Sequence, residues 1–77
     1  MAERRYFVTH EGITMDVRIC RNRFGKLVIR GWVDGEERMG HEVAEDRSGP
    51  DSRRIHRAII YRIEEIKRER KLEGLNG

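Results

Sequence analysis

The sequence predicts an α+β fold, in which an antiparallel β-meander of three or four strands precedes one long C-terminal helix packed on one sheet face. Residues 13–20 alternate strictly between apolar and polar side chains, which is typical of a half-buried strand. Residues 55–66 place apolar side chains three and four positions apart, which is the period of a helix. Between these segments, Asp34-Gly35 is a strong hairpin signal.

The individual strands follow from local composition. Residues 5–10 are rich in aromatic and β-branched types and predict a first strand, which a turn connects to the alternating strand 13–20. Residues 26–33 predict the next strand, and 36–43 predict the last, after the Asp34-Gly35 turn. In the intervening turn at 21–25, Asn22 or Gly25 is expected to adopt a positive φ.

The Asp34-Gly35 turn also predicts how the last two strands pair. An uninterrupted register pairs Val33 with Glu36 and Arg30 with Met39. One face then holds Val28, Arg30, Trp32, Met39, His41 and Val43, and the other holds Leu27, Ile29, Gly31, Val33, Arg38 and Glu42. One helix covers only one of these faces. The other face is covered by residues 6–8 or by a loop, or the strand twists so that its side chains do not form a second continuous face. Alternatively, this face packs against a second copy or another protein.

A loop from Ala44 to about Ser52 is expected to lead into the helix, predicted over about 50–73. The stretch 48–51, Ser-Gly-Pro-Asp, has the form of a capping box with a proline near the first turn. Gly74 is expected to end the helix after Leu72. The stripe that faces the sheet consists of Ile55, Ala58, Ile59, Ile63 and Ile66.

Length and composition limit the class of protein. The 77 residues predict a single small domain, 1–77, whose charged content of 40 % is high for a globular protein. No apolar run is long enough to cross a bilayer, and no leader is recognised at Met1. The only cysteine, Cys20, has no partner for an intrachain disulfide. We therefore expect a small basic cytoplasmic protein that does not act at a membrane.

The net charge of +3 is divided unevenly along the chain. Residues 1–33 carry seven basic and three acidic side chains. Residues 34–52 carry two basic and seven acidic side chains, and residues 53–77 carry eight basic and four acidic ones. Two basic clusters contain no acid, namely the turn at 21–26 and the helix start at 53–57. Cations at a helix start are disfavoured by the macrodipole. The second cluster therefore implies either pairing with the acidic segment 34–46 or an external anion.

These clusters predict a non-enzymatic domain that binds DNA, RNA or a nucleoprotein complex. The proposed contacts are Arg18, Arg21, Arg23, Lys26, Arg53, Arg54 and Arg57, with Phe24 and Tyr61 as surfaces on which bases could stack. The order of elements is similar to that of the arm-binding, three-stranded-sheet-and-helix domains of phage-type integrases. The similarity lies in element order alone, without a residue motif.

The alternative is a small protein-binding inhibitor or adaptor of the phage or mobile-element type, directed at a host protein. It would act against host defence, in the manner of an anti-CRISPR protein, by occlusion or by DNA mimicry through the acidic segment 34–46. Trp32 and Met39 would then belong to a protein interface, which a homodimer would also use.

No enzyme, cofactor or metal site is expected. Ser48 and Ser52 are explained as residues of the helix entry. The three histidines and Cys20 show no spacing typical of metal ligands.

Overall fold

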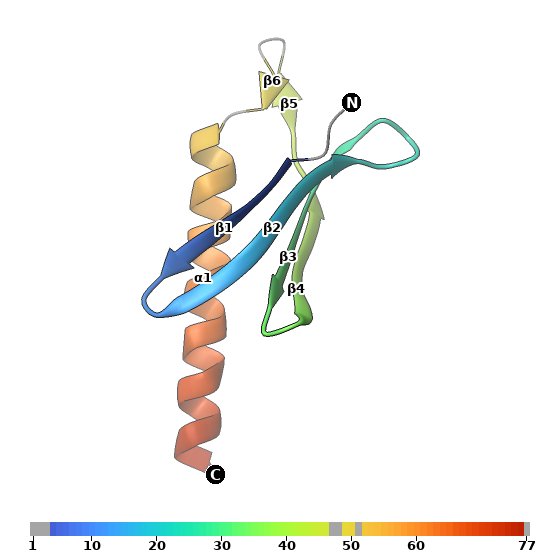
Figure 1. Cartoon of the computed structure of the whole chain (residues 1–77). Coiled ribbons are helices and arrows are strands. Elements are labelled where there is room, and N and C mark those ends of the chain that lie inside the picture. Colours follow the sequence, from blue (N-terminus) through green and yellow to red (C-terminus); the bar gives the residue numbers. More distant parts are fainter. Residues whose placement is uncertain (1–3, 47–48, 51, 77) are drawn as a thin grey trace.

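The computed structural model describes residues 4–46, 49–50 and 52–76, and it confirms the α+β class. Four antiparallel strands form an open sheet in the order β1-β2-β3-β4, and one helix, α1, follows them (Figure 1). The strands are β1, Arg4–His10; β2, Ile13–Arg21; β3, Leu27–Val33; and β4, Glu36–Glu42. The helix α1 spans Ser52–Asn76.

The connection between sheet and helix differs from the predicted loop. Two short strands, β5 (Glu45–Asp46) and β6 (Gly49–Pro50), pair with each other there. The proline therefore ends a short strand, and the helix begins two residues later. Ser48 and Asp51 of the expected capping box lie outside the described residues. The helix also continues beyond the expected stop, because Gly74 remains helical.

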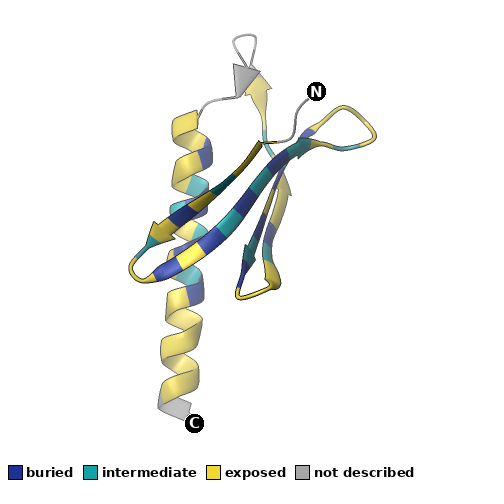
Figure 2. Ribbon diagram, in the orientation of Figure 1, coloured by how far each residue is buried: buried dark blue, intermediate teal, exposed yellow. Residues whose placement is uncertain are grey.

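The core lies between one sheet face and the apolar stripe of α1, which passes behind β1 and β2 in Figure 1. Alternate residues of β2 are buried, and Figure 2 shows this alternation along the strand. The helix contributes Ile55, Ile59, Ile63 and Ile66, as the period predicted. Residues 67–74 are all exposed. Within the described chain, no helix is long and apolar enough to cross a bilayer.

Two tight turns connect the outer pairs of strands. Glu11 and Gly12 have φ values of 50° and 81°, and Asp34 and Gly35 have values of 53° and 81°. Positive φ at both central residues is the signature of a type I′ turn, whose twist matches that of the flanking strands. The longer turn between β2 and β3 uses Gly25, with φ of 76°.

The pairing of β3 with β4 differs from the predicted register. Trp32 pairs with Glu37 as expected, but Gly31 pairs with Met39, so that Arg38 is the extra residue of a β-bulge. Every later residue of β4 is thereby shifted to the opposite face. Met39 consequently lies in the core, 6 % exposed, and the prediction that it shares a face with Trp32 is wrong.

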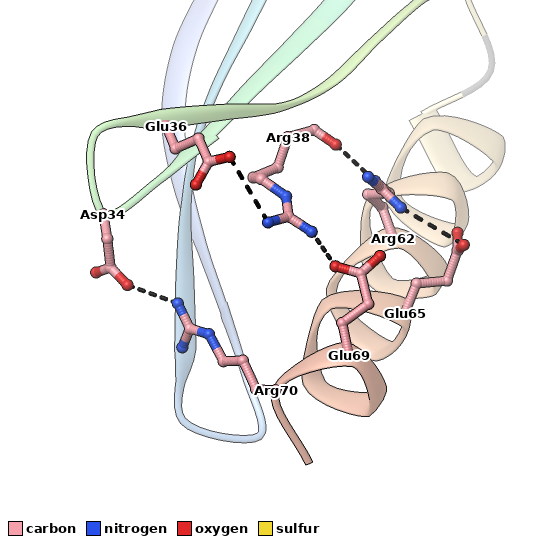
Figure 3. Close-up of polar contacts among 7 residues, drawn as sticks. All are labelled: Asp34, Glu36, Arg38, Arg62, Glu65, Glu69 and Arg70. Atoms are coloured by element: carbon pink, nitrogen blue, oxygen red, sulfur yellow. Dashed lines mark hydrogen bonds and ion pairs between the residues drawn. The ribbon is translucent and has the colours of Figure 1, made fainter. Parts of the chain in front are cut away.

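The bulge directs Arg38 toward the helix (Figure 3). Its guanidinium forms an ion pair with Glu69 and lies 3.9 Å from Glu36. Its carbonyl oxygen accepts a hydrogen bond of 2.5 Å from Nε of Arg62, whose guanidinium also contacts Glu65. These contacts connect the irregular part of β4 to α1. A further pair, Arg70–Asp34 at 2.5 Å, connects the β3–β4 turn to the helix.

We predict that Gly31→Ala destabilises the fold by about 1–3 kcal/mol, the usual cost of overpacking a core. A Cβ atom on Gly31 would lie 2.4 Å from Sδ of the fully buried Met15 and 3.2 Å from Cβ of Met39. Equilibrium unfolding in urea measures the loss.

The matched control is Gly40→Ala, since this residue also lies in a strand without positive φ. Its Cβ would meet only the exposed Glu37 carboxylate, at 3.3 Å. The control should change stability by less than about 0.5 kcal/mol. Equal losses in the two variants would contradict the packing argument.

Candidate nucleic-acid interface

A groove lies between the edge strand β4 and the first turns of α1. The strand contributes the stretch 38–41, and the helix contributes one side of its surface. Four arginines and one histidine line this groove against a single acid: Arg38, Arg54, Arg57, Arg62, His41 and Glu65. Arg38 and Arg62 already pair with Glu69 and Glu65, so less of this positive charge is open to a ligand than the number of arginines implies.

The helical period explains which side chains reach the groove. Residues 54, 57, 58, 61, 62 and 65 follow one another at spacings of three and one, which places them along one side of a helix. The isoleucine stripe fixes the rotation of α1 on the sheet, so this adjacent side faces β4. Ala58 and Met39, which pack against the core, form the apolar part of the lining.

Arg57 and Tyr61 are the groove residues most available to a ligand. In the part of the chain that the structure describes, Arg57 makes no hydrogen bond or ion pair. Tyr61 follows one helical turn later and is 62 % exposed. Arg53 and Arg54 stand in the first turn, which contains no acid to offset the helix macrodipole. Of these two, Arg54 lines the groove.

The tip of the β2–β3 hairpin, residues 22–26, is held by its own hydrogen bonds. Oδ1 of Asn22 accepts from the backbone N–H groups of Phe24 (2.9 Å) and Lys26 (3.0 Å). This side chain therefore organises the turn, while Gly25 supplies the positive φ. Phe24 projects with 73 % exposure, and the guanidinium of Arg23 lies 5.0 Å from its ring centroid.

Arg21, in contrast, is engaged inside the molecule. Its guanidinium donates two hydrogen bonds to the Glu45 carboxylate, at 2.7 and 2.9 Å, and one to the carbonyl of Gly25. The hydrogen bonds from Arg21, together with the nearby charge of Lys26, lower the pKa of Glu45. The same pairing raises the pKa of Arg21. Arg21 therefore serves to hold β5 beside the end of β2.

Other acids of the segment 34–46 are also paired within the chain. Asp34 pairs with Arg70, Glu36 with Arg38, and Glu37 with Arg30. Much of the acidic charge between the two basic clusters is thereby offset by arginines of the sheet and of the helix beyond its first turns.

The predicted contacts Arg18 and Trp32 lie elsewhere, on the sheet face opposite the helix, which we call the outer face. The guanidiniums of Arg18 and Arg30 lie 4.7 and 4.8 Å from the Trp32 ring centroid. Cross-strand pairing places Arg5, Arg18 and Arg30 side by side on three strands. The next row across the same face contains Phe7, Asp16, Trp32 and Glu37.

Hydrogen bonds within the outer face shift the pKa of its acids. Arg5 donates to Asp16 at 2.9 and 3.2 Å and thereby lowers the pKa of that carboxyl. Arg30 lowers the pKa of Glu37 in the same way. Arg18 lies 3.8 Å from Asp16, and in the described structure its buried Nε has no hydrogen-bond partner.

Apart from Arg21 and Met39, the predicted contacts are thus divided among three places. The groove brings together Arg54, Arg57 and Tyr61, and the hairpin tip carries Arg23, Phe24 and Lys26. In Figure 1 the tip and the start of α1 lie at the same end of the molecule, away from the C-terminus. Arg53 is exposed beside the groove, whereas Arg18 and Trp32 are on the outer face.

Sequence reasoning missed three of the basic groove residues. His41 was assigned to the wrong sheet face because the bulge was not foreseen. Arg38 was assigned to the face of Leu27, Ile29 and Val33, which the structure shows to be the helix-covered one, but not to a basic site. Arg62 could have been predicted from the helical period. It lies four positions after Ala58 and five after Arg57, on the same side of the helix.

Comparisons with known proteins found no family model, no curated protein and no solved structure that matches this chain. The function must therefore be inferred from the chain's own side chains.

We predict that acid weakens the fold through Asp16, Glu37 and Glu45. Each has a pKa lowered by an arginine in the folded protein. Each carboxylate therefore stabilises the fold fully when the pH is above its pKa in the unfolded chain, about 3.9–4.3. This contribution is lost as the pH falls through the lower pKa that the group has in the folded protein. Urea unfolding at pH 7, 4 and 3 should show this loss.

The triple variant Asp16→Asn, Glu37→Gln, Glu45→Gln tests the assignment. It should be less stable than the parent at pH 7 and should lose less stability between pH 4 and 3. The same acid profile in both proteins would assign the sensitivity to other groups.

Proposed function

We propose that this protein binds nucleic acid in the groove between β4 and α1, with the hairpin tip as a second contact. The observation that carries the proposal is the excess of arginine in the groove beside an exposed aromatic ring. Proteins that bind nucleic acid combine a basic groove along the phosphates with aromatic rings on which bases stack. Arg57 and Tyr61 supply these two elements within one helical turn.

The hairpin tip adds a second pair of the same kind. Phe24 is exposed, its turn is fixed by Asn22, and Arg23 lies over its ring. A rigid turn that presents an aromatic ring loses little entropy when it binds. Lys26, on the same tip, adds a further exposed cation.

Action by DNA mimicry receives less support from the same contacts. A phosphate mimic needs carboxylates that are available to a basic partner. In the segment 34–46, however, Asp34, Glu37 and Glu45 form close ion pairs within the chain. We therefore favour a polyanion over a basic protein as the partner.

The double variant Arg54→Gln, Arg57→Gln tests the groove. Binding to duplex and to single strand at 50 mM salt should weaken roughly tenfold, because phosphate contacts are lost regardless of sequence. The slope of log affinity against log salt should fall by about 0.7–0.9 for each contact. Fluorescence anisotropy with labelled oligonucleotides measures both quantities.

The control variant Arg68→Gln, Lys71→Gln removes the same charge from the same helix. These residues lie at least 11 positions beyond Arg57, or roughly 16 Å along the helix axis, which exceeds the Debye length of about 14 Å at 50 mM salt. The control should bind nearly as the parent does. Equal losses in both variants, or no salt-sensitive binding by the parent at 50 mM salt, would reject the proposal.

We further predict that Tyr61→Ala weakens single-strand binding by about 1–3 kcal/mol, the usual contribution of one stacked base. Duplex binding should change little, because paired bases are not free to stack on the ring. The ratio of single-strand to duplex affinity is therefore the measurement. An unchanged ratio would mean that Tyr61 does not stack on a base.

A further inference from the structure

Three exposed side chains of the groove between β4 and α1 are available to a ligand: His41, Arg57 and Tyr61. Each makes no hydrogen bond or ion pair with any other residue that the structure describes. His41 comes from the strand, and the other two come from the helix. The groove thus offers rings on both of its walls and a cation beside them. A nucleotide needs the same two groups, a flat surface for its base and a positive charge for its phosphate.

The bulge in β4 determines the side on which His41 stands. His41 pairs with Ile29, which is fully buried on the helix side of the sheet. Side chains of directly paired residues lie on the same face of a sheet. The His41 ring is therefore on the face that carries α1, while Glu42, the next residue, is on the outer face.

Contacts between the strand and the helix show which parts of the two walls are level. Arg62 donates a hydrogen bond to the carbonyl oxygen of Arg38, and Arg70 pairs with Asp34. The helix therefore runs toward the β3–β4 turn. His41 lies three residues beyond Arg38 in the opposite direction, or about 10 Å along the strand. The same length of helix is about six or seven residues, so His41 is level with the first two turns of α1.

The floor of the groove is apolar, and one of its ends is closed. Met39, a core residue, and Ala58, which packs against the core, form the floor. Two ion pairs stand at the end toward the C-terminus of α1: Arg38–Glu69 and Arg62–Glu65 (Figure 3). The carboxylates of these pairs repel phosphate. A phosphate is therefore favoured at the other end, where Arg57 stands.

We propose that this groove receives one unpaired nucleotide of a single-stranded nucleic acid, an inference that rests on the proposed function. The base lies on the apolar floor between the rings of His41 and Tyr61, and its phosphate contacts Arg57. The volume of the groove is about 620 Å³, within the range of about 300–1,000 Å³ that is usual for ligand pockets. Arg54, one turn before Ala58, adds positive charge to the same wall.

A regular duplex cannot place a base in this groove. Its bases are stacked and paired, so only its phosphates reach the rim. A helix reads paired bases by entering the major groove, which is about 12 Å wide and is filled by a single helix of about 10–12 Å. Here β4 stands beside the side of α1 that carries Arg57 and Tyr61, and the two elements together are too wide to enter. The ligand is therefore a single strand.

Oligonucleotides that differ only in their bases provide the test. An abasic strand keeps the phosphate charge and lacks the bases. At 50 mM salt, the parent protein should bind a short thymidine strand roughly tenfold more tightly than an abasic strand of the same length, which is the usual effect of one stacked base. A duplex with one bulged thymidine should exceed the same duplex with an abasic bulge by about the same factor. Fluorescence anisotropy measures these constants.

Variants assign the base to the groove. His41→Ala and Tyr61→Ala should each reduce the ratio of thymidine-strand to abasic-strand affinity from about tenfold to less than about threefold. His56→Ala and Phe7→Ala are the matched controls, because each removes an exposed ring outside the groove, on α1 and on the outer face. The controls should keep the parent's ratio. Circular dichroism confirms that each variant is folded.

The possible failures of the two proposals are distinguishable. Equal binding of thymidine and abasic strands by the parent would overturn this inference and leave the proposed function standing, because the phosphates would still be bound. Folded His41→Ala and Tyr61→Ala variants that keep the parent's ratio would overturn it as well. Displacement of the strand by polyglutamate as effectively as by unlabelled strand would assign the groove to an acidic peptide. Failure of the parent to bind any strand or duplex at 50 mM salt would reject both proposals.

Discussion

The side chain of Met15 occupies the space in which residue 31 would carry a Cβ atom, and much of the structure depends on this contact. Because residue 31 is glycine, Met15 is fully buried between β2 and the helix, and Met39 packs beside it. The bulge at Arg38 brings Met39 into this position. It also turns Arg38 toward α1, where Glu69 and Arg62 hold it. Core packing and attachment of the edge strand therefore have one local cause.

The same bulge separates two surfaces with different charge. On the helix side, β4 presents His41 to the groove, where Arg54 and Arg57 stand. On the outer face, Gly40 is the β4 residue paired with Arg30. The row of Arg5, Arg18 and Arg30 is therefore followed on β4 by a residue without a side chain. Without the shift, Met39 would share the outer face with Trp32, and that face would be more apolar. The register thus determines the chemistry of both surfaces.

Much of the fold could be predicted from local sequence. The alternation in β2, the isoleucine period in α1 and the two-residue turn at Asp34-Gly35 each depend on residues close in the chain. The bulge could not, because it appears only in the pairing of Gly31 with Met39, and the Arg38 side chain that it directs to the helix pairs with Glu69, 31 residues later. The short β5–β6 pair was missed for a similar reason, since Glu45 is held by Arg21, 24 residues earlier.

The candidate site was predictable only in part. The basic helix start was visible as a cluster without acids, and the groove contains two of its arginines. Charge clustering did not show which arginines are already paired. Arg21 appeared equivalent to Arg23 in sequence, yet only Arg21 is bound to a carboxylate in the described structure. The row of Arg5, Arg18 and Arg30 could be predicted only from the pairing of three strands. The Glu11-Gly12 turn alone aligns two of its members, Arg5 and Arg18.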